Sequence, residues 1–112
     1  PVIELLRKDP RMEIAAAITF FAVIVAPFSE EILFRGTLYL PLRSKIGPVY
    51  ACIIVSVIFG AIHLYLWGFV YLFVVGLIFV ILAETTRSLL VPIAAHAVHN
   101  ALMVAALFAG LD

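Results

Sequence analysis

Charged residues and cysteine are both scarce in this sequence. Only 12% of its 112 residues are Asp, Glu, Lys or Arg, against about a quarter in a soluble domain, and 66% are hydrophobic. The formal net charge is zero, which argues against nucleic acid or another polyanion as a partner. The single cysteine, Cys52, excludes an internal disulfide and a cysteine-based zinc site, and we expect it to be a small core residue. So apolar a composition is typical of a membrane protein.

A signal-peptide layout is also absent, since no basic start, short apolar core and small-residue cleavage site open the chain. The first residue is proline and not an initiator methionine, so we expect a piece of a longer protein with further helices before it. Residues 1–13 are polar and of mixed charge, which is typical of an interfacial segment or a solvated linker. The length suits a single membrane-embedded domain, residues 1–112.

Apolar runs separated by polar or proline-rich segments predict an all-α fold, a polytopic membrane bundle of about four helices of roughly 20 residues each. The expected ranges are 12–40, 49–66, 69–83 and 92–111. We expect Pro27 to break the first helix and Ser29 to cap its second half. A turn is expected at 41–48 and a loop of solvated charges at 84–88. Both termini then lie on one side, but basic residues divide equally between the sides, which leaves the orientation open.

Polar side chains inside these helices are few, and each needs a reason because a charge at a helix centre in lipid costs about 2.5–3.5 kcal/mol. They are Glu30, Glu31, Arg35, His63, His96, His99 and Asn100. Glu31 and Arg35 are four residues apart on one helix face and can form an ion pair. Glu30 has no such neighbour, so its partners are expected on other helices.

Counting the helical rise from the helix ends brings Glu30, His63 and His96 to the same half of the membrane. On the last helix, His96 and Asn100 are one turn apart and can face one object. His99 points in another direction, and we expect it to be a core or interface histidine. The helices therefore predict one polar site formed by residues from separate parts of the chain.

Two chemistries suit this set, and both hydrolyse an amide inside or at the edge of the membrane. In the first, Glu30, His63 and His96 bind a divalent metal, zinc above all, which lowers the pKa of its bound water towards about 7 and polarises a carbonyl. In the second, no metal is needed. Glu30, aided by His63, deprotonates a water as general base, and His96 and Asn100 donate to the oxyanion.

Three motifs on successive helices resemble the CPBP or Abi family. They are Glu30-Glu31-x-x-x-Arg35, Phe59-x-x-x-His63 and His96-x-x-x-Asn100. That family contains the CaaX prenyl endopeptidases of the endoplasmic reticulum and bacterial relatives linked to bacteriocin processing or immunity. The resemblance implies an intramembrane endopeptidase, metal-dependent or glutamate-dependent, whose substrate is a membrane-associated peptide or protein such as a prenylated CaaX protein.

The resemblance also implies roles for the motif residues. Glu30 would be the activating carboxylate and His63 its partner, while His96 and Asn100 would form an oxyanion hole. Two further motif residues would support the site: these are Glu31 and Arg35. The resemblance leaves open which substrate is cut and whether a metal is required.

Two rival functions of other classes stay open at this point. A proton- or ion-coupled transporter is one, because Glu and His relays in membranes also mark proton paths. A non-catalytic bacteriocin-immunity protein that keeps the fold is the other. The absence of inverted-repeat symmetry weighs against the transporter. In either case we expect a multi-pass protein of a bacterial plasma membrane, in preference to the endoplasmic reticulum, and the sequence indicates no oligomeric state.

Overall fold

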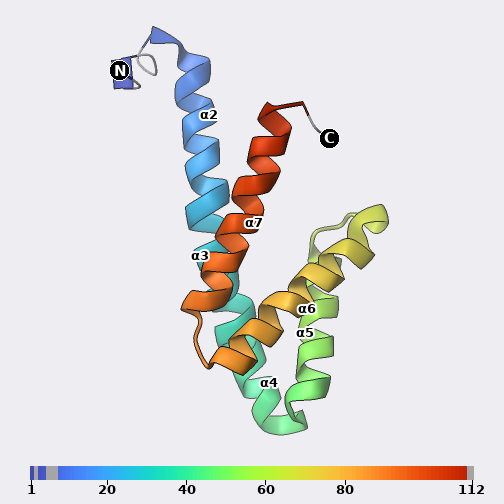
Figure 1. Ribbon diagram of the computed structural model, residues 1–112. Helices are drawn as coiled ribbons and strands as arrows, with labels where there is room; N and C mark the ends of the chain where they lie inside the picture. The colour runs from blue at the N-terminus through green and yellow to red at the C-terminus, as the bar shows by residue number, and fades with distance from the viewer. Residues whose placement is uncertain (2, 5–7, 111–112) are drawn as a thin grey trace.

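The computed structural model describes residues 1, 3–4 and 8–110, and throughout this part the regular structure is helical (Figure 1). The segments in chain order are α2 (Pro10–Phe20), the π-helical turn η1 (Phe21–Val25), α3 (Ala26–Glu31), the π-helical segment η2 (Ile32–Leu38), α4 (Tyr39–Ile46), α5 (Pro48–Ile62), the 3-10 turn η3 (Leu66–Gly68), α6 (Phe69–Thr86) and α7 (Leu90–Phe108). The expected all-α membrane bundle is therefore confirmed.

Two pairs of helices make the bundle, and they meet at the α4 end in a V (Figure 1). The long helix Pro10–Ile46 lies beside α7, and α5 lies beside α6 (Figure 1). Within the described residues, three helices are long and apolar enough to cross a membrane: Pro10–Ile46, Leu66–Thr86 and Leu90–Phe108. The fourth expected span is α5, an apolar helix of only 15 residues. Both termini lie at the open end of the V, as the sequence predicts (Figure 1).

The first long helix has no break, so the prediction at Pro27 is wrong. Val25 and Ala26, which precede the proline, keep right-handed helical dihedral angles. The π-helical turn η1 ends just before Pro27, and its wider turn accommodates a residue that has no N–H and whose ring would crowd an ordinary α-helical turn. Ser29 is not a cap either, because its hydroxyl donates to the carbonyl of Val25 at 2.8 Å.

The expected turn at 41–48 is much shorter than predicted. Pro41 lies inside α4 and, like Pro27, follows a π-helical segment, in this case η2. The chain reverses only at Gly47, whose φ of 86° lies in the left-handed region that favours glycine. Pro48 then begins α5, a position that needs no N–H donor.

Glu84 lies in the last turns of α6, so the predicted loop of solvated charges at 84–88 is wrong for this residue. Its Oε2 accepts hydrogen bonds from Tyr39 Oη at 2.6 Å and from Arg43 Nε at 2.7 Å. These contacts fasten α6 to α4. Arg87 does agree with the prediction, because its side chain is 72% exposed.

The remaining helix ends differ by a few residues from the expected ranges. Helix α5 ends at Ile62 and not at residue 66, while α6 continues to Thr86. Helix α7 begins at Leu90 and ends at Phe108, and the expected end at residue 111 lies outside the described residues. Residues 2 and 5–7 of the predicted interfacial segment also lie outside them.

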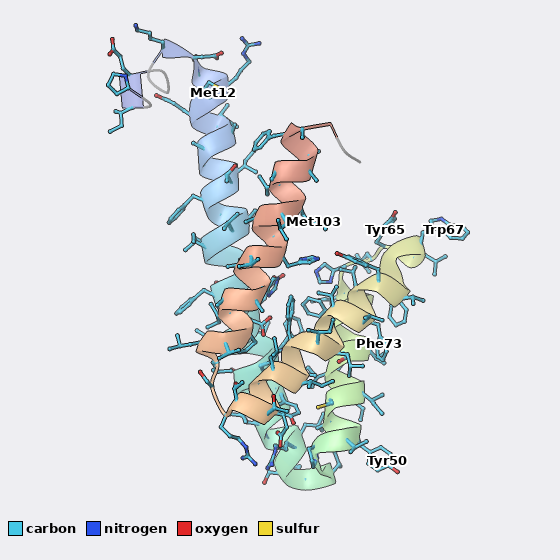
Figure 2. All side chains as sticks on the ribbon, in the orientation of Figure 1. Met12, Tyr50, Tyr65, Trp67, Phe73 and Met103 are labelled. Atoms are coloured by element: carbon cyan, nitrogen blue, oxygen red, sulfur yellow. The ribbon has the colours of Figure 1, made fainter. Side chains whose placement is uncertain are left out.

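The packed core lies where η2, α5 and α6 meet. Its buried members are Phe34, Tyr39, Ala51, Cys52, Val55, Phe59 and Val80. Cys52 is thus the core residue that the sequence predicts. Much of the remaining apolar surface faces outward, as in a protein built for lipid. Tyr50 projects at one end of the α5–α6 pair and Tyr65 and Trp67 project at the other, where aromatic residues mark membrane–water boundaries (Figure 2).

Candidate active site

A buried ion cluster joins the first long helix to α7. Glu31 and Arg35 are fully buried, and Arg35 Nη1 lies 3.3 Å from Glu31 Oε1. The same carboxylate oxygen accepts a hydrogen bond from His96 Nδ1 at 2.7 Å. The predicted Glu31–Arg35 pair is therefore present. It is part of a cluster of three residues, because His96 also binds Glu31.

Arg35 also binds groups that have no charge. Its Nη2 donates to the backbone carbonyl of Gly76 on α6 at 2.7 Å. The guanidinium carbon lies 4.7 Å from the ring centre of Phe59 and 5.5 Å from that of Phe79. Cation–π contacts of this kind are stronger when water is excluded. Arg35 thereby links the first long helix to α5 and α6, and it holds the carboxylate of Glu31 in place.

Glu30 occupies a different environment from its neighbour. Its side chain is 32% exposed, and its Oε2 lies 3.3 Å from His96 Nε2. His96 is only 4% exposed and stacks on the Phe79 ring at 4.7 Å. The imidazole therefore lies between two carboxylates, with Glu31 on its Nδ1 side and Glu30 on its Nε2 side.

A cavity of about 250 Å³ opens beside this cluster. Its polar lining consists of Glu30, His63, His96, His99 and Asn100. Its apolar lining comes from η1, α3, α5 and α6 and includes Phe21, Phe59 and Leu72. The predicted convergence of a carboxylate, imidazoles and an amide from separate helices is therefore seen in the fold. Glu31 and Arg35 lie behind the cavity and do not line it.

His63 lies at the end of α5, and its tautomer follows from one contact. Its Nδ1 is 2.6 Å from the carbonyl oxygen of Phe59. A carbonyl can only accept, so Nδ1 carries the proton and the neutral ring has its lone pair on Nε2. The Phe59 ring packs edge-on against the imidazole with 4.8 Å between centres, as the motif spacing predicts. The ring nitrogen without a proton is therefore available to a water in the cavity.

Asn100 is held by a chain of hydrogen bonds that the sequence did not suggest. Its Nδ2 donates to the carbonyl of Ala22 in η1 at 2.8 Å, and its Oδ1 lies 3.3 Å from His99 Nδ1. His99 Nε2 is hydrogen bonded to the hydroxyl of Tyr71 on α6. These contacts share one consistent set of donors: Tyr71 donates to His99, and His99 donates to Asn100. The second hydrogen on Asn100 Nδ2 is left for another acceptor.

His99 therefore does more than the core or interface role expected of it, since it lines the cavity and contacts Asn100. Tyr71 and Gly76 were not predicted as site residues. Tyr71 lies in the first turn of α6. No neighbouring residue in the sequence indicates that its partner is a histidine 28 positions later. Gly76 does give a signal in the sequence, because a glycine inside an apolar membrane helix is typical of a close-packing position. In the fold a Cβ there would lie 2.7 Å from Phe59 Cδ1.

The donors as arranged do not form the predicted metal site. Glu30 Oε2 and His96 Nε2 are 3.3 Å apart, so these two atoms alone could reach one cation. His63 lines the same cavity, but within the described part of the chain no three His, Cys, Asp or Glu side chains are grouped as a ligand set. A zinc site needs three protein ligands or more. The residues present thus do not fit a bound zinc ion in this geometry.

Two comparisons with known proteins give matches. A family model described as type II CAAX prenyl endopeptidase Rce1-like matches residues 12–102, a range that contains all the candidate residues. A curated protein of Bacillus subtilis (strain 168), named "Putative membrane peptidase YdiL", is 32% identical over 103 residues. That match covers 92% of this chain but 40% of the relative, so the chain spans less than half of that protein's length. No solved structure matches.

Proposed function

The chain belongs to the type II CAAX prenyl endopeptidase Rce1-like family, and on that premise we propose that its polar cavity hydrolyses a peptide bond of a membrane-associated substrate. One observation carries the proposal. Glu30, His63, His96 and Asn100, which come from three helices, line a single cavity in a chain that is 66% hydrophobic. Ionisable groups at membrane depth are functional by default, because their burial is costly.

Glu30 is the general base in this mechanism. Its carboxylate is the more exposed of the two in the cluster, so it can reach a water that enters the cavity. It takes one proton from that water while the oxygen attacks the carbonyl carbon of the substrate. The unprotonated Nε2 of His63 accepts a hydrogen bond from the other hydrogen of the water and thereby orients the water for attack. A tetrahedral oxyanion results.

The oxyanion is stabilised by donors that are already in place. The free hydrogen on Asn100 Nδ2 is one donor, and its direction is set by the bonds of that amide to Ala22 and His99. His96 Nε2 is the second donor when the ring is an imidazolium, the only form with an N–H on both nitrogens. That form also balances the charges of Glu30, Glu31 and Arg35. Donors fixed before the reaction are worth more than solvent, because they need no reorganisation.

The collapse of the tetrahedral intermediate returns the proton. Protonated Glu30 donates it to the leaving amine nitrogen as the carbon–nitrogen bond breaks, so one water is consumed and an acid and an amine are released. Glu31 and Arg35 touch neither the water nor the substrate. They position His96, because the hydrogen bond from Nδ1 to Glu31 fixes the direction of Nε2.

The substrate is proposed as a membrane-associated peptide or protein, and the family description points to prenylated CaaX proteins as one class. A bacterial plasma membrane is the proposed location, in agreement with the Bacillus relative. A divalent cation at this site would supply a Lewis acid and a more acidic water. Because the donors do not form a three-ligand set, the mechanism above assigns every step to the chain's own residues.

Proteolysis of a membrane-anchored peptide in nanodiscs tests the proposal. Wild-type protein should release two peptide products at one bond, identified by mass spectrometry. Glu30→Gln should release them about 10²–10⁴-fold more slowly, because the amide cannot take the proton. Glu13→Gln is the matched control, since Glu13 lies exposed in the first turn of α2, outside the cavity lining, and should cleave like wild type. Equal cleavage by wild type and Glu30→Gln would refute the proposal.

A further inference from the structure

A second polar cavity lies at the α4 end of the bundle, and the peptidase mechanism does not use it. Its volume is about 410 Å³, and it lies between α4, the end of α6 and the link that leads into α7. Its polar lining consists of Arg35, Tyr39, Arg43, Ser44, Glu84, Arg87 and Ser88. We call it the arginine groove. It has three guanidinium groups and only one carboxylate.

The one carboxylate of the arginine groove already accepts three short hydrogen bonds. Glu84 Oε2 accepts from both Tyr39 and Arg43, and Oε1 accepts from Arg43 Nη2 at 2.8 Å. The contact from Arg87 Nη2 to Oε1 is long, at 3.7 Å. A single charge therefore serves two arginines, and the shorter bonds go to Arg43. Arg87 keeps most of its donors for another acceptor.

Arg35 forms the buried floor of the arginine groove. Its side chain is fully buried, and its Nε has no hydrogen-bond acceptor among the described residues. Its Nη1 is close enough to Glu31 for charge attraction but forms no hydrogen bond. Buried donors without an acceptor are rare in folded proteins and call for an explanation such as a ligand. Nε and Nη1 of Arg35 are closed to solvent, so a ligand in the groove meets the donors of the rim above a floor that carries a positive charge.

Arg87 is placed at the rim by an unusual backbone conformation. Its φ is 55°, in the left-handed region that non-glycine residues seldom adopt, and its amide closes the last turn of α6 on Ala83. Next to it, Ser88 Oγ accepts a hydrogen bond from the amide of Leu90, which leaves the hydroxyl hydrogen free to donate. Guanidinium and hydroxyl donors side by side suit the oxygens of a phosphate group.

The position of the arginine groove decides between a free anion and a lipid. The groove lies where α4 and α6 end and α7 begins, at the end of the bundle where Tyr50 projects outward (Figures 1 and 2). Helix ends of this kind lie at the headgroup level of the membrane. Two apolar side chains, Leu40 and Leu89, line the groove beside the donors. A ligand with both a phosphate and apolar chains can bind the polar donors and also pack against the leucines.

We propose that the arginine groove binds the phosphate of an anionic phospholipid headgroup. Basic pockets between membrane helices are known to take such headgroups. The bound phosphate supplies acceptors for Arg87 and for the hydroxyl groups of the rim, while the acyl chains leave along the outer surface of the bundle. None of the rim residues of this site lines the candidate active site, and Arg35 at its floor is the residue that the peptidase proposal also uses, as a positioning residue.

The test is a titration of the purified full chain with short-chain phosphatidylglycerol, short-chain phosphatidylcholine and inorganic phosphate, with bound ligand counted by native mass spectrometry. We expect one phosphatidylglycerol to bind in preference to phosphatidylcholine, and inorganic phosphate not to displace it. Arg87→Gln should weaken binding by about fivefold, the size of effect expected for one basic side chain at an anionic surface. Ser88→Ala should weaken it in the same direction by a smaller factor.

Lys45→Gln is the matched control. Lys45 lies in the last turn of α4, exposed at the same end of the bundle, and does not line the groove. Its loss should leave the affinity for phosphatidylglycerol unchanged. Equal weakening by Lys45→Gln and Arg87→Gln would show diffuse surface attraction and overturn the site. Equal binding of the two lipids, or displacement by inorganic phosphate, would overturn the lipid assignment, and melting curves of each variant verify that it is folded.

Discussion

Gly76→Ala should loosen the packing that holds Arg35 and the candidate active site. A Cβ at residue 76 would lie 2.7 Å from Phe59 Cδ1 and 3.2 Å from Phe59 Cγ. Phe59 cannot easily move, because it is buried with edge contacts to Phe34 at 5.4 Å and to His63 at 4.8 Å. Alanine gains about 1 kcal/mol over glycine in helix propensity, whereas overpacking costs about 1–3 kcal/mol. The difference predicts a net loss of up to about 2 kcal/mol.

The assay is thermal unfolding of the purified protein in detergent, with Gly36→Ala as the matched control. Gly36 is also a helical glycine, but a Cβ there meets only Leu89 Cδ1 at 3.4 Å, an ordinary van der Waals contact. We therefore expect Gly36→Ala to melt at or above the wild-type temperature and Gly76→Ala to melt several degrees below it. If both variants melt together, the close approach of α6 to Phe59 is not what restricts residue 76.

The remaining predictions concern the buried charges and the metal. Glu31→Gln removes the carboxylate that pairs with the fully buried Arg35, so we expect a loss of about 3–5 kcal/mol in the free energy of unfolding, measured by denaturant titration. Glu84→Gln should melt below wild type but above Glu31→Gln, because Glu84 is 20% exposed and solvent screens its bonds. Dialysis against a chelator should leave peptidase activity intact, whereas a loss that zinc restores would contradict the metal-free mechanism.

The helical architecture follows from the apolar runs of the sequence, since composition and periodicity are local signals. The errors fall on the two prolines inside the first long helix. A proline usually ends or bends a helix, and at Pro27 and Pro41 that rule fails because π-helical segments precede both residues. The chain between them mixes apolar residues with the charged residues Glu30, Glu31 and Arg35, and no local pattern in it indicates where a wider turn will form.

The sequence predicted which residues form the candidate site, but it did not predict most of the contacts between them. The i,i+4 spacing is enough to predict the pair of Glu31 and Arg35. The third member, His96, lies 65 positions later in the chain, and only the packing of α7 against α3 shows that it contacts Glu31 as well as Glu30. The sequence predicted His96 as a metal ligand or as a donor to the oxyanion and not as the partner of Glu31, because helix spacing gives the direction of a side chain and not its partner.

Contacts between charged residues far apart in the chain could not be predicted from the sequence either. Glu84 and Arg87 look alike in sequence, as two charges in a short polar stretch between apolar runs. In the fold Glu84 turns towards Tyr39 and Arg43 on α4, while Arg87 faces outward. The difference depends on the register between α4 and α6, which tertiary packing decides.

A double-mutant cycle on kcat tests whether Glu30 and His63 act on one water in the cavity. Glu30→Gln should lower kcat by about 10²–10⁴-fold, as expected for a lost general base, and His63→Gln by less. Because residues that act as a unit are not additive, the double variant should be no slower than Glu30→Gln alone. A double variant whose kcat falls by the product of the two single effects would contradict the account.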